Sequence, residues 1–152
     1  MPYGPVPGYT TSTTAAPTGR SSATFVMTGC NTTFTPQATG RVLVLCTGYI
    51  GNGTTTDGMS WKIMYGTGAA PANNDAVSGT ICGAVCSMAS VVTSCLQVPL
   101  ISQGIVTGLV PATISAKGDT VAGTTYWFDL AFSYITGGTV TPVQVVLTII
   151  EF

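Results

Sequence analysis

The segment GTTYWFDLAFSY, residues 123–134, has the two-residue alternation that is typical of a β-strand. It presents one set of side chains on each face: Tyr126, Phe128, Leu130, Phe132 and Tyr134 on the first, and Trp127, Asp129, Ala131 and Ser133 on the second. The first face is apolar and is expected to lie in a core. The second face would normally be solvated, but it begins with a tryptophan and carries only one charge. We therefore expect both faces of this strand to be covered.

Two other segments are apolar on both faces, RVLVLCTGYI at 41–50 and VQVVLTII at 143–150. Strands that are buried on both sides need a further layer on each side, and a sandwich of this length has only two layers. We therefore predict that another copy of the chain supplies the extra cover. The predicted oligomer interface consists of Trp127, Asp129, Ala131, Val146 and Ile150. The alternative is that a long loop of the same chain folds over the Trp127 face.

The chain from residue 24 onward favours an all-β sandwich or barrel, because short β-branched and aromatic runs alternate with Gly, Asn, Pro and Thr. We predict strands at 24–29, 41–50, 59–65, 83–92, 104–110, 124–134 and 139–150. Turn-forming residues separate them at 51–58, 66–75, 115–119 and 136–138. No segment combines helical periodicity with helix caps, so we expect no helix longer than one turn.

Residues 1–22 differ from the rest of the chain, since they hold four of the nine prolines and show no strand-like alternation. Proline favours extended conformations, so this segment is predicted to be an extended arm that precedes a domain at 23–152. An arm without a core of its own can pack side chains into grooves of a partner. The candidate anchoring residues are Tyr3, Val6 and Tyr9.

The charge content is unusually low, at 6% of residues with a net charge of −1, against roughly 25% charged residues in an ordinary soluble domain. Only four cations are present, so no basic patch exists to neutralise phosphates, and we expect no nucleic-acid partner. No apolar run reaches about 18 residues, so we expect no membrane span. The first residues lack the features of a signal peptide, which predicts a chain made in a reducing cytoplasm.

Catalysis is disfavoured because the chain has no histidine, the most common general base and metal ligand. The five acids are scattered and most lie in or next to predicted turns. Ser60 and Lys62 share a strand face, where a catalytic dyad is conceivable, but two polar residues on a solvated face are the better interpretation. We expect no enzymatic activity, no catalytic residue, no cofactor and no metal.

Five cysteines are an odd number, which a closed disulfide framework cannot use up. Cys82, Cys86 and Cys95 form a cluster of three, whereas a zinc site made only of cysteine needs four thiolates. Cys30 or Cys46 could complete such a site. Because free cysteine is among the most buried residue types, buried and reduced thiols are the favoured interpretation, and the individual roles of the three clustered cysteines stay open.

Three stretches together resemble small virion proteins of tailed bacteriophages: the head-fibre, decoration and tail-fibre head domains. They are TFTPQATGRVLVLCTGYIGN, WKIMYGTGAAPANNDAV and VTGLVPATISAKGDTVAGTTYWFDLAFSYITGGTVTPVQVVLTIIEF. The shared order is a Thr-Pro lead-in to an apolar strand, a YGTG loop, a YWFDL strand and a TGGT turn before the last strand. The resemblance covers residues 24–152, except that segment 81–95 does not fit the pattern, so strand order through 76–103 is open.

This resemblance implies an antiparallel, jelly-roll-like β-sandwich that forms a homotrimer and has a structural role in the virion. The implied partners are further copies of the chain and the major capsid protein or another virion protein. The implied location is the virion, assembled in the host bacterial cytoplasm. Decoration of the capsid is favoured over the alternative, a tail-fibre head that binds a host glycan or protein, because the loops at 51–58 and 66–75 are small and polar and the chain has no long shaft.

Overall fold

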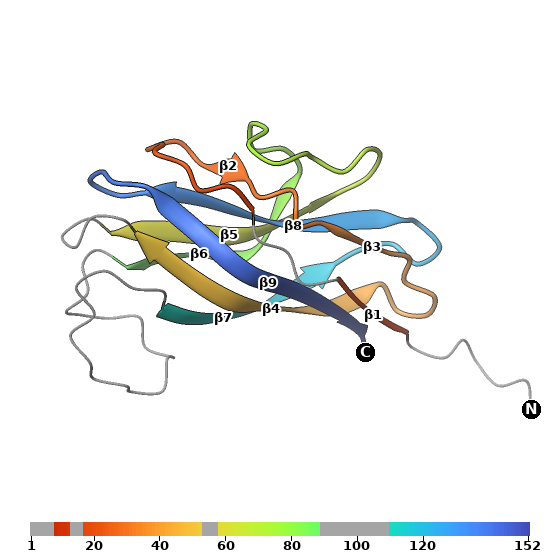
Figure 1. Ribbon diagram of the computed structural model, residues 1–152. Helices are drawn as coiled ribbons and strands as arrows, with labels where there is room; N and C mark the ends of the chain where they lie inside the picture. The colour runs from red at the N-terminus through yellow and green to blue at the C-terminus, as the bar shows by residue number, and fades with distance from the viewer. Residues whose placement is uncertain (1–7, 13–16, 53–57, 89–109) are drawn as a thin grey trace, which may run out of the picture.

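The computed structural model describes residues 8–12, 17–52, 58–88 and 110–152, which form two antiparallel sheets stacked as a β-sandwich (Figure 1). The strands are β1 (Tyr9–Thr11), β2 (Val26–Met27), β3 (Thr32–Phe34), β4 (Arg41–Asn52), β5 (Met59–Gly66), β6 (Thr80–Met88), β7 (Val110–Asp119), β8 (Tyr126–Tyr134) and β9 (Val140–Glu151). One sheet has the order β1-β9-β4-β7. The other has the order β2-β8-β5-β6, and β3 also pairs with β8. The described residues contain no helix, and the predicted β-sandwich is confirmed.

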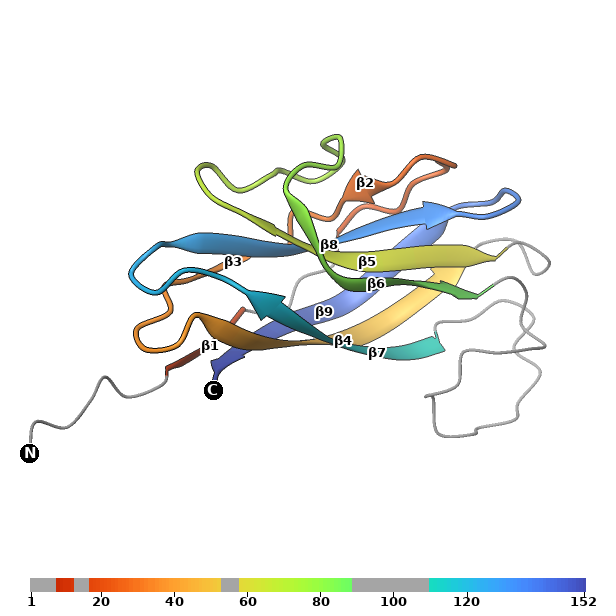
Figure 2. The same ribbon diagram turned by 180° about the vertical axis from the view of Figure 1, so that it is seen from behind.

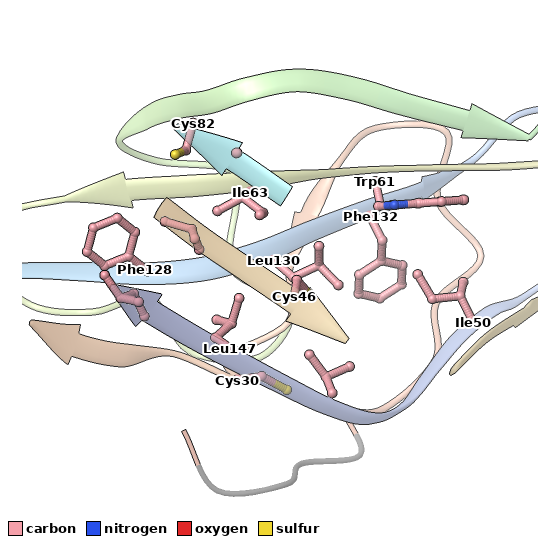
Figure 3. Packing of buried hydrophobic residues seen from close by; sticks show 14 of the residues in the cluster. Cys30, Cys46, Ile50, Trp61, Ile63, Cys82, Phe128, Leu130, Phe132 and Leu147 are labelled. Carbon is pink, nitrogen blue, oxygen red and sulfur yellow. The ribbon is translucent and has the colours of Figure 1, made fainter. Parts of the chain in front are cut away.

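The core lies between the sheets and is built from alternate residues of the four long strands. Phe128, Leu130 and Phe132 of β8 point inward, as the alternation of this segment predicted, and all three are fully buried. Figure 3 shows Leu130 and Phe132 in the same packed cluster as Cys46 of β4 and Leu147 of β9. The first apolar face of β8 therefore has the role that its sequence predicts.

Most predicted strands coincide with observed ones, but the centre of the chain needs a correction. The segment SAKGD at 115–119 was predicted to be a turn, yet it is the second half of β7 and pairs with β4 in register from Asp119 with Arg41. Its glycine and aspartate resemble turn residues locally, whereas the long β4 strand offers a full ladder of backbone partners. Residues 89–92 and 104–109 of the predicted strands lie outside the described residues.

The N-terminal arm is partly integrated into the sandwich. Strand β1 pairs with the edge of β9, with Tyr9 opposite Ile150, and further along the chain Arg20 forms an isolated bridge to Val140. Residues 8–12 and Arg20 therefore cover one edge of a sheet instead of preceding the domain as a separate arm. Tyr3 and Val6 lie outside the described residues, so their predicted anchoring role stays a prediction.

Candidate functional site

The second face of β8 is covered by the same chain, which corrects the predicted position of the oligomer interface. Trp127 is 3% exposed, and Asp129 and Ala131 are 0% exposed. The cover consists of residues 25–31 and 66–79, which we call the outer layer. In both ribbon views these segments lie over the outer side of the β8–β5 sheet (Figure 2). Trp127, Asp129 and Ala131 are thus unavailable to a second subunit, as the loop alternative proposed.

A second, smaller hydrophobic cluster holds the outer layer against the sheet. Met64, Trp127 and Ala131 of the sheet are buried together with Met27, and the partly buried Phe25, Ala70 and Val77 pack against them. The Trp127 ring lies next to two glycines, because a Cβ added at Gly66 or at Gly79 would come within 2.7 Å or 2.6 Å of its ring atoms. The indole N–H of Trp127 donates to the Thr67 carbonyl at 3.3 Å.

Hydrogen bonds between its two segments fasten the outer layer. The Met27 N–H donates to the Asp75 carbonyl and the Asn74 N–H donates to the Met27 carbonyl, both at 2.9 Å. The Asn73 side-chain amide donates to the Thr28 carbonyl at 2.7 Å. The predicted 66–75 turn is therefore a fixed lid over the sheet, and its asparagines are used in holding it.

Asp129 is a buried carboxylate between β8 and the outer layer. The Thr28 hydroxyl donates to it, as do the Gly29 N–H at 2.9 Å and the Leu130 N–H at 2.7 Å. Burial raises the pKa of Asp129 to about 6, and these hydrogen bonds offset part of that rise. The group ties the outer layer to the sheet and has no contact with solvent.

The outer side of the other sheet has no comparable cover from any described residue. We call it the β9 face; its outward side chains are Tyr9, Thr11, Leu43, Leu45, Thr47, Tyr49, Val143, Val146, Thr148 and Ile150. Directly opposed residues form rows across the strands. One row runs from Tyr9 through Ile150 to Leu43, and the next runs from Thr11 through Thr148 to Leu45.

A bulge in β9 enlarges this apolar face. The pairing register with β4 shifts between Thr47 and Tyr49, and Gln144 has a φ of 52°. The extra residue brings both Val143 and Val146 to the outer side, although simple alternation assigned them to opposite faces. Val146 and Ile150, the two remaining residues of the predicted interface, are partly exposed here. Tyr9 of the predicted arm is 75% exposed in the same face.

Charge on the β9 face is confined to one end of the sheet. Lys117 lies opposite Leu43, and Arg41 lies opposite Asp119. The Arg41 guanidinium also stacks over the Phe152 ring at 5.2 Å from its centroid. The outward side chains named for the β9 face are uncharged, whereas Arg41, Lys117 and Asp119 are exposed at one end of the same sheet. Two such faces can meet without burying unpaired charge when that end stays at the solvent-exposed rim.

Glu151 anchors the end of β9 and was missed as a structural residue in the sequence. Its carboxylate accepts hydrogen bonds from four consecutive backbone N–H groups, those of Gln37, Ala38, Thr39 and Gly40, at 2.6–3.0 Å. Burial by itself would raise the pKa of Glu151, but these donors outweigh it and lower the pKa to about 2. A carboxylate that binds backbone groups within its own turn can be recognised from local sequence. Glu151 binds residues that are more than 100 positions away, so no local pattern reveals its role.

Three of the cysteines are buried, and the side chains of Ser60 and Lys62 contact other groups instead of forming a catalytic dyad. Cys30, Cys46 and Cys82 are free and buried, and burial raises the pKa of each thiol, to about 11 for Cys30 and Cys82 and about 12 for Cys46. Such thiols are inert. Ser60 Oγ is hydrogen-bonded to Ser87 Oγ at 2.8 Å, and the Lys62 ammonium lies 4.4 Å from the Phe25 ring centroid, so these two groups have other partners.

Within the described residues, no three His, Cys, Asp or Glu side chains are grouped so that they could hold a metal ion. Cys86 belongs to β6, and Cys95 lies outside the described residues. The described part of the chain also has no helix that is long and apolar enough to cross a membrane.

Comparisons with known proteins support the fold. The chain matched no protein-family model and no curated protein sequence. Among solved structures it is similar to Eiger TNF from S. frugiperda, with a TM-score of 0.51 and 11% sequence identity over 96% of this chain and 92% of that one. At this identity the likeness concerns the fold alone, and it supports a jelly-roll sandwich.

Proposed function

We propose that the protein is a non-enzymatic virion structural protein that assembles through its β9 face and decorates a phage capsid. The observation that carries the proposal is the contrast in cover. The chain closes the outer side of the β8 sheet with its own outer layer, but no described residue covers the β9 face, whose charges are confined to one end. An apolar and threonine-rich face of this kind favours protein partners over nucleic acid or a charged surface.

The size of the β9 face is adequate for an interface between copies. Its two longest strands have 12 residues each, so at about 3.3 Å per residue and about 4.8 Å between strands the four-stranded face can bury roughly 600 Å² per partner. That area lies at the lower end of stable interfaces, which bury about 1,200–2,000 Å² in total. The area is therefore adequate for association of copies through this face, and the homotrimer that the sequence resemblance implies is the proposed unit.

The virion role rests on the sequence resemblance to phage decoration and head-fibre proteins, with which the jelly-roll fold agrees. The proposed partner of the trimer is the major capsid protein, and the proposed location is the virion. Head decoration is preferred to a tail-fibre head because the asparagines of the 66–79 loop are bonded to residues 27–28 and are used in holding the outer layer.

The test introduces a charge into the face. Val146→Glu places a carboxylate in the centre of the β9 face, and burial between two copies would leave it unpaired. We expect this variant to stay folded and to have the mass of a monomer by light scattering, and to lose binding to capsids that lack the native protein. Ala122→Glu is the matched control, since Ala122 lies in an exposed turn away from this face.

Two results would contradict the proposal. The first is a wild-type protein that is monomeric at micromolar concentration. The second is a Val146→Glu variant that assembles and binds capsids as the control does. Electron microscopy of particles carrying the bound protein distinguishes decoration of the head from attachment at the tail.

A further inference from the structure

Strand β1 is held on the sandwich through backbone pairing with β9 and through the hydroxyl groups of Thr11 and Ser12, which are hydrogen-bonded to the same strand. Its three residues pair with β9 alone. The flanking bonds run from the Glu151 N–H to the Gly8 carbonyl at 2.9 Å and from the Ser12 N–H to the Leu147 carbonyl at 2.8 Å. The side chains of Tyr9 and Thr11 are exposed. Recognition of this strand thus depends on the β9 edge and very little on packing within its own chain.

The edge of β9 is prepared for an antiparallel strand over most of its length. From Tyr9 to Arg20 the chain advances 11 positions, while the paired residues on β9 go from Ile150 back to Val140, which is 10 positions. The pairing of Tyr9 with Ile150 and that of Arg20 with Val140 therefore differ in register by one residue. A sheet edge of this kind can bind an added strand through backbone hydrogen bonds.

A second copy of the chain offers the same strand. Because β1 is the first described strand and pairs with no strand other than β9, its transfer to a neighbour breaks no other strand pairing. The bonds lost in one chain are regained in the other, so the choice depends on how close the copies are held. Tyr9 lies beside Ile150 in the β9 face, so assembly through that face brings β1 next to the neighbouring copies.

We propose that in the assembled protein the β9 edge binds β1 of a neighbouring copy by strand exchange. The inference rests on the proposed assembly through the β9 face and names the segment that links the copies. The donor is the segment from Gly8 to Ser12, and the acceptor is the β9 edge from Leu147 to Glu151.

The experiment uses Thr11 and Thr148, whose hydroxyl oxygens are 3.1 Å apart across the strand pair. A Thr11→Cys variant is prepared with a size tag and mixed with an untagged Thr148→Cys variant under assembly conditions, and oxidised glutathione is then added. A disulfide between the two variants forms when β1 of one chain lies on β9 of the other. Because Thr11 and Thr148 both belong to the β9 face, a mixture of the Leu45→Cys and Thr148→Cys single variants shows whether contact across that face alone gives a bridge between chains. We expect a covalent heterodimer of distinct mass on a non-reducing gel.

Two controls define the result. Each single variant oxidised by itself reveals bridges to the native cysteines or between identical positions. The double variant Leu45→Cys/Thr148→Cys links β4 with β9, whose ten paired positions are not exchanged, so it gives only an intrachain bridge in the monomer band.

The outcomes separate this inference from the proposed function. An oligomer in which the mixed variants form no heterodimer, and in which Thr11→Cys/Thr148→Cys bridges only within the chain, overturns strand exchange and leaves assembly intact. A chain that never oligomerises overturns both proposals. A heterodimer that disappears when Val146→Glu blocks assembly supports both.

Discussion

Each sheet of the sandwich has a strand that is apolar on both faces, but the outer sides of the two sheets have opposite surroundings. Strand β8 carries Trp127 outward and is covered by the outer layer, whereas β9 carries Val146 and Ile150 outward without cover from any described residue. Both patterns are apolar on two faces. The difference teaches that such a strand indicates a further layer but does not tell whether the same chain or another one supplies it.

The largest effect on the unfolding free energy is expected from the loss of the Trp127 side chain on the covered face. Trp127→Ala removes the central side chain of the outer-layer cluster, and large-to-small changes of buried aromatic residues cost about 3–5 kcal/mol of unfolding free energy. Tyr49→Ala is the matched aromatic change on the β9 face, where the side chain is 39% exposed, and it should cost about 1 kcal/mol or less in the isolated chain. Urea unfolding in the background of the Val146→Glu variant, which is expected to be monomeric, measures both losses. Equal losses of unfolding free energy in the two variants would contradict the conclusion that only the Trp127 face is covered by its own chain.

An intermediate effect is expected from two glycines of the outer-layer segment that both have positive φ. Gly68 and Gly79 have φ values of 83° and 77°, and a side chain in this region costs about 1–2 kcal/mol at either position. A Cβ at Gly68 would meet nothing within 4 Å, but one at Gly79 would lie 2.4 Å from the Tyr65 carbonyl oxygen and 2.6 Å from Trp127. Gly79→Ala should therefore destabilise the protein by a further about 1–3 kcal/mol beyond Gly68→Ala, measured as the difference in urea midpoint.

If the two glycine variants were equally stable, the outer layer would not be packed tightly on Trp127. A near-ultraviolet circular dichroism spectrum provides an independent check, because displacement of the tryptophan ring changes its signal. We expect that spectrum to change for Gly79→Ala and to match the wild type for Gly68→Ala.

The sequence predicted the elements that depend on local pattern. Alternation in 41–50 and 124–134 is sufficient to predict β4 and β8 as strands, and the predicted inward set of β8 faces the core. The cover of Trp127 could not be predicted in the same way. Its apolar contacts from Phe25, Ala70 and Val77 are isolated residues in loops without any period.

Two further features depend on contacts that are distant in sequence. The bulge at Gln144 changes which valines of β9 face outward, and a single positive φ cannot be inferred from alternation. The clamp on Glu151 joins the end of the chain to residues 37–40. Of the five residues predicted to form the interface, Trp127, Asp129 and Ala131 are buried within the chain, and the interface role of the partly exposed Val146 and Ile150 stays a prediction.

A further effect is expected from pH, because the two buried carboxylates of the compared regions act in opposite directions. Asp129 beneath the outer layer has its pKa raised from 3.8 to about 6, so the folded chain binds a proton more tightly than the unfolded chain between these values. Its contribution to the unfolding free energy is fully present below pH 3.8 and is lost as the pH rises to 6. Glu151 at the end of β9 has its pKa lowered from 4.5 to about 2, so its contribution is present above pH 4.5 and is lost as the pH falls to 2. The unfolding free energy from these two groups together should pass through a maximum near pH 4.

Chemical unfolding from pH 2 to 7 measures this profile. Asp129→Asn is expected to remove the decline between pH 3.8 and 6, and Glu151→Gln is expected to remove the rise between pH 2 and 4.5. A wild-type profile that both variants follow without change would mean that neither carboxylate is held as the structure describes. The thiols of Cys30 and Cys46 face Asp129 but have pKa values of about 11 and 12, so they stay neutral throughout this range and leave the decline above pH 3.8 to the carboxylate that fastens the outer layer.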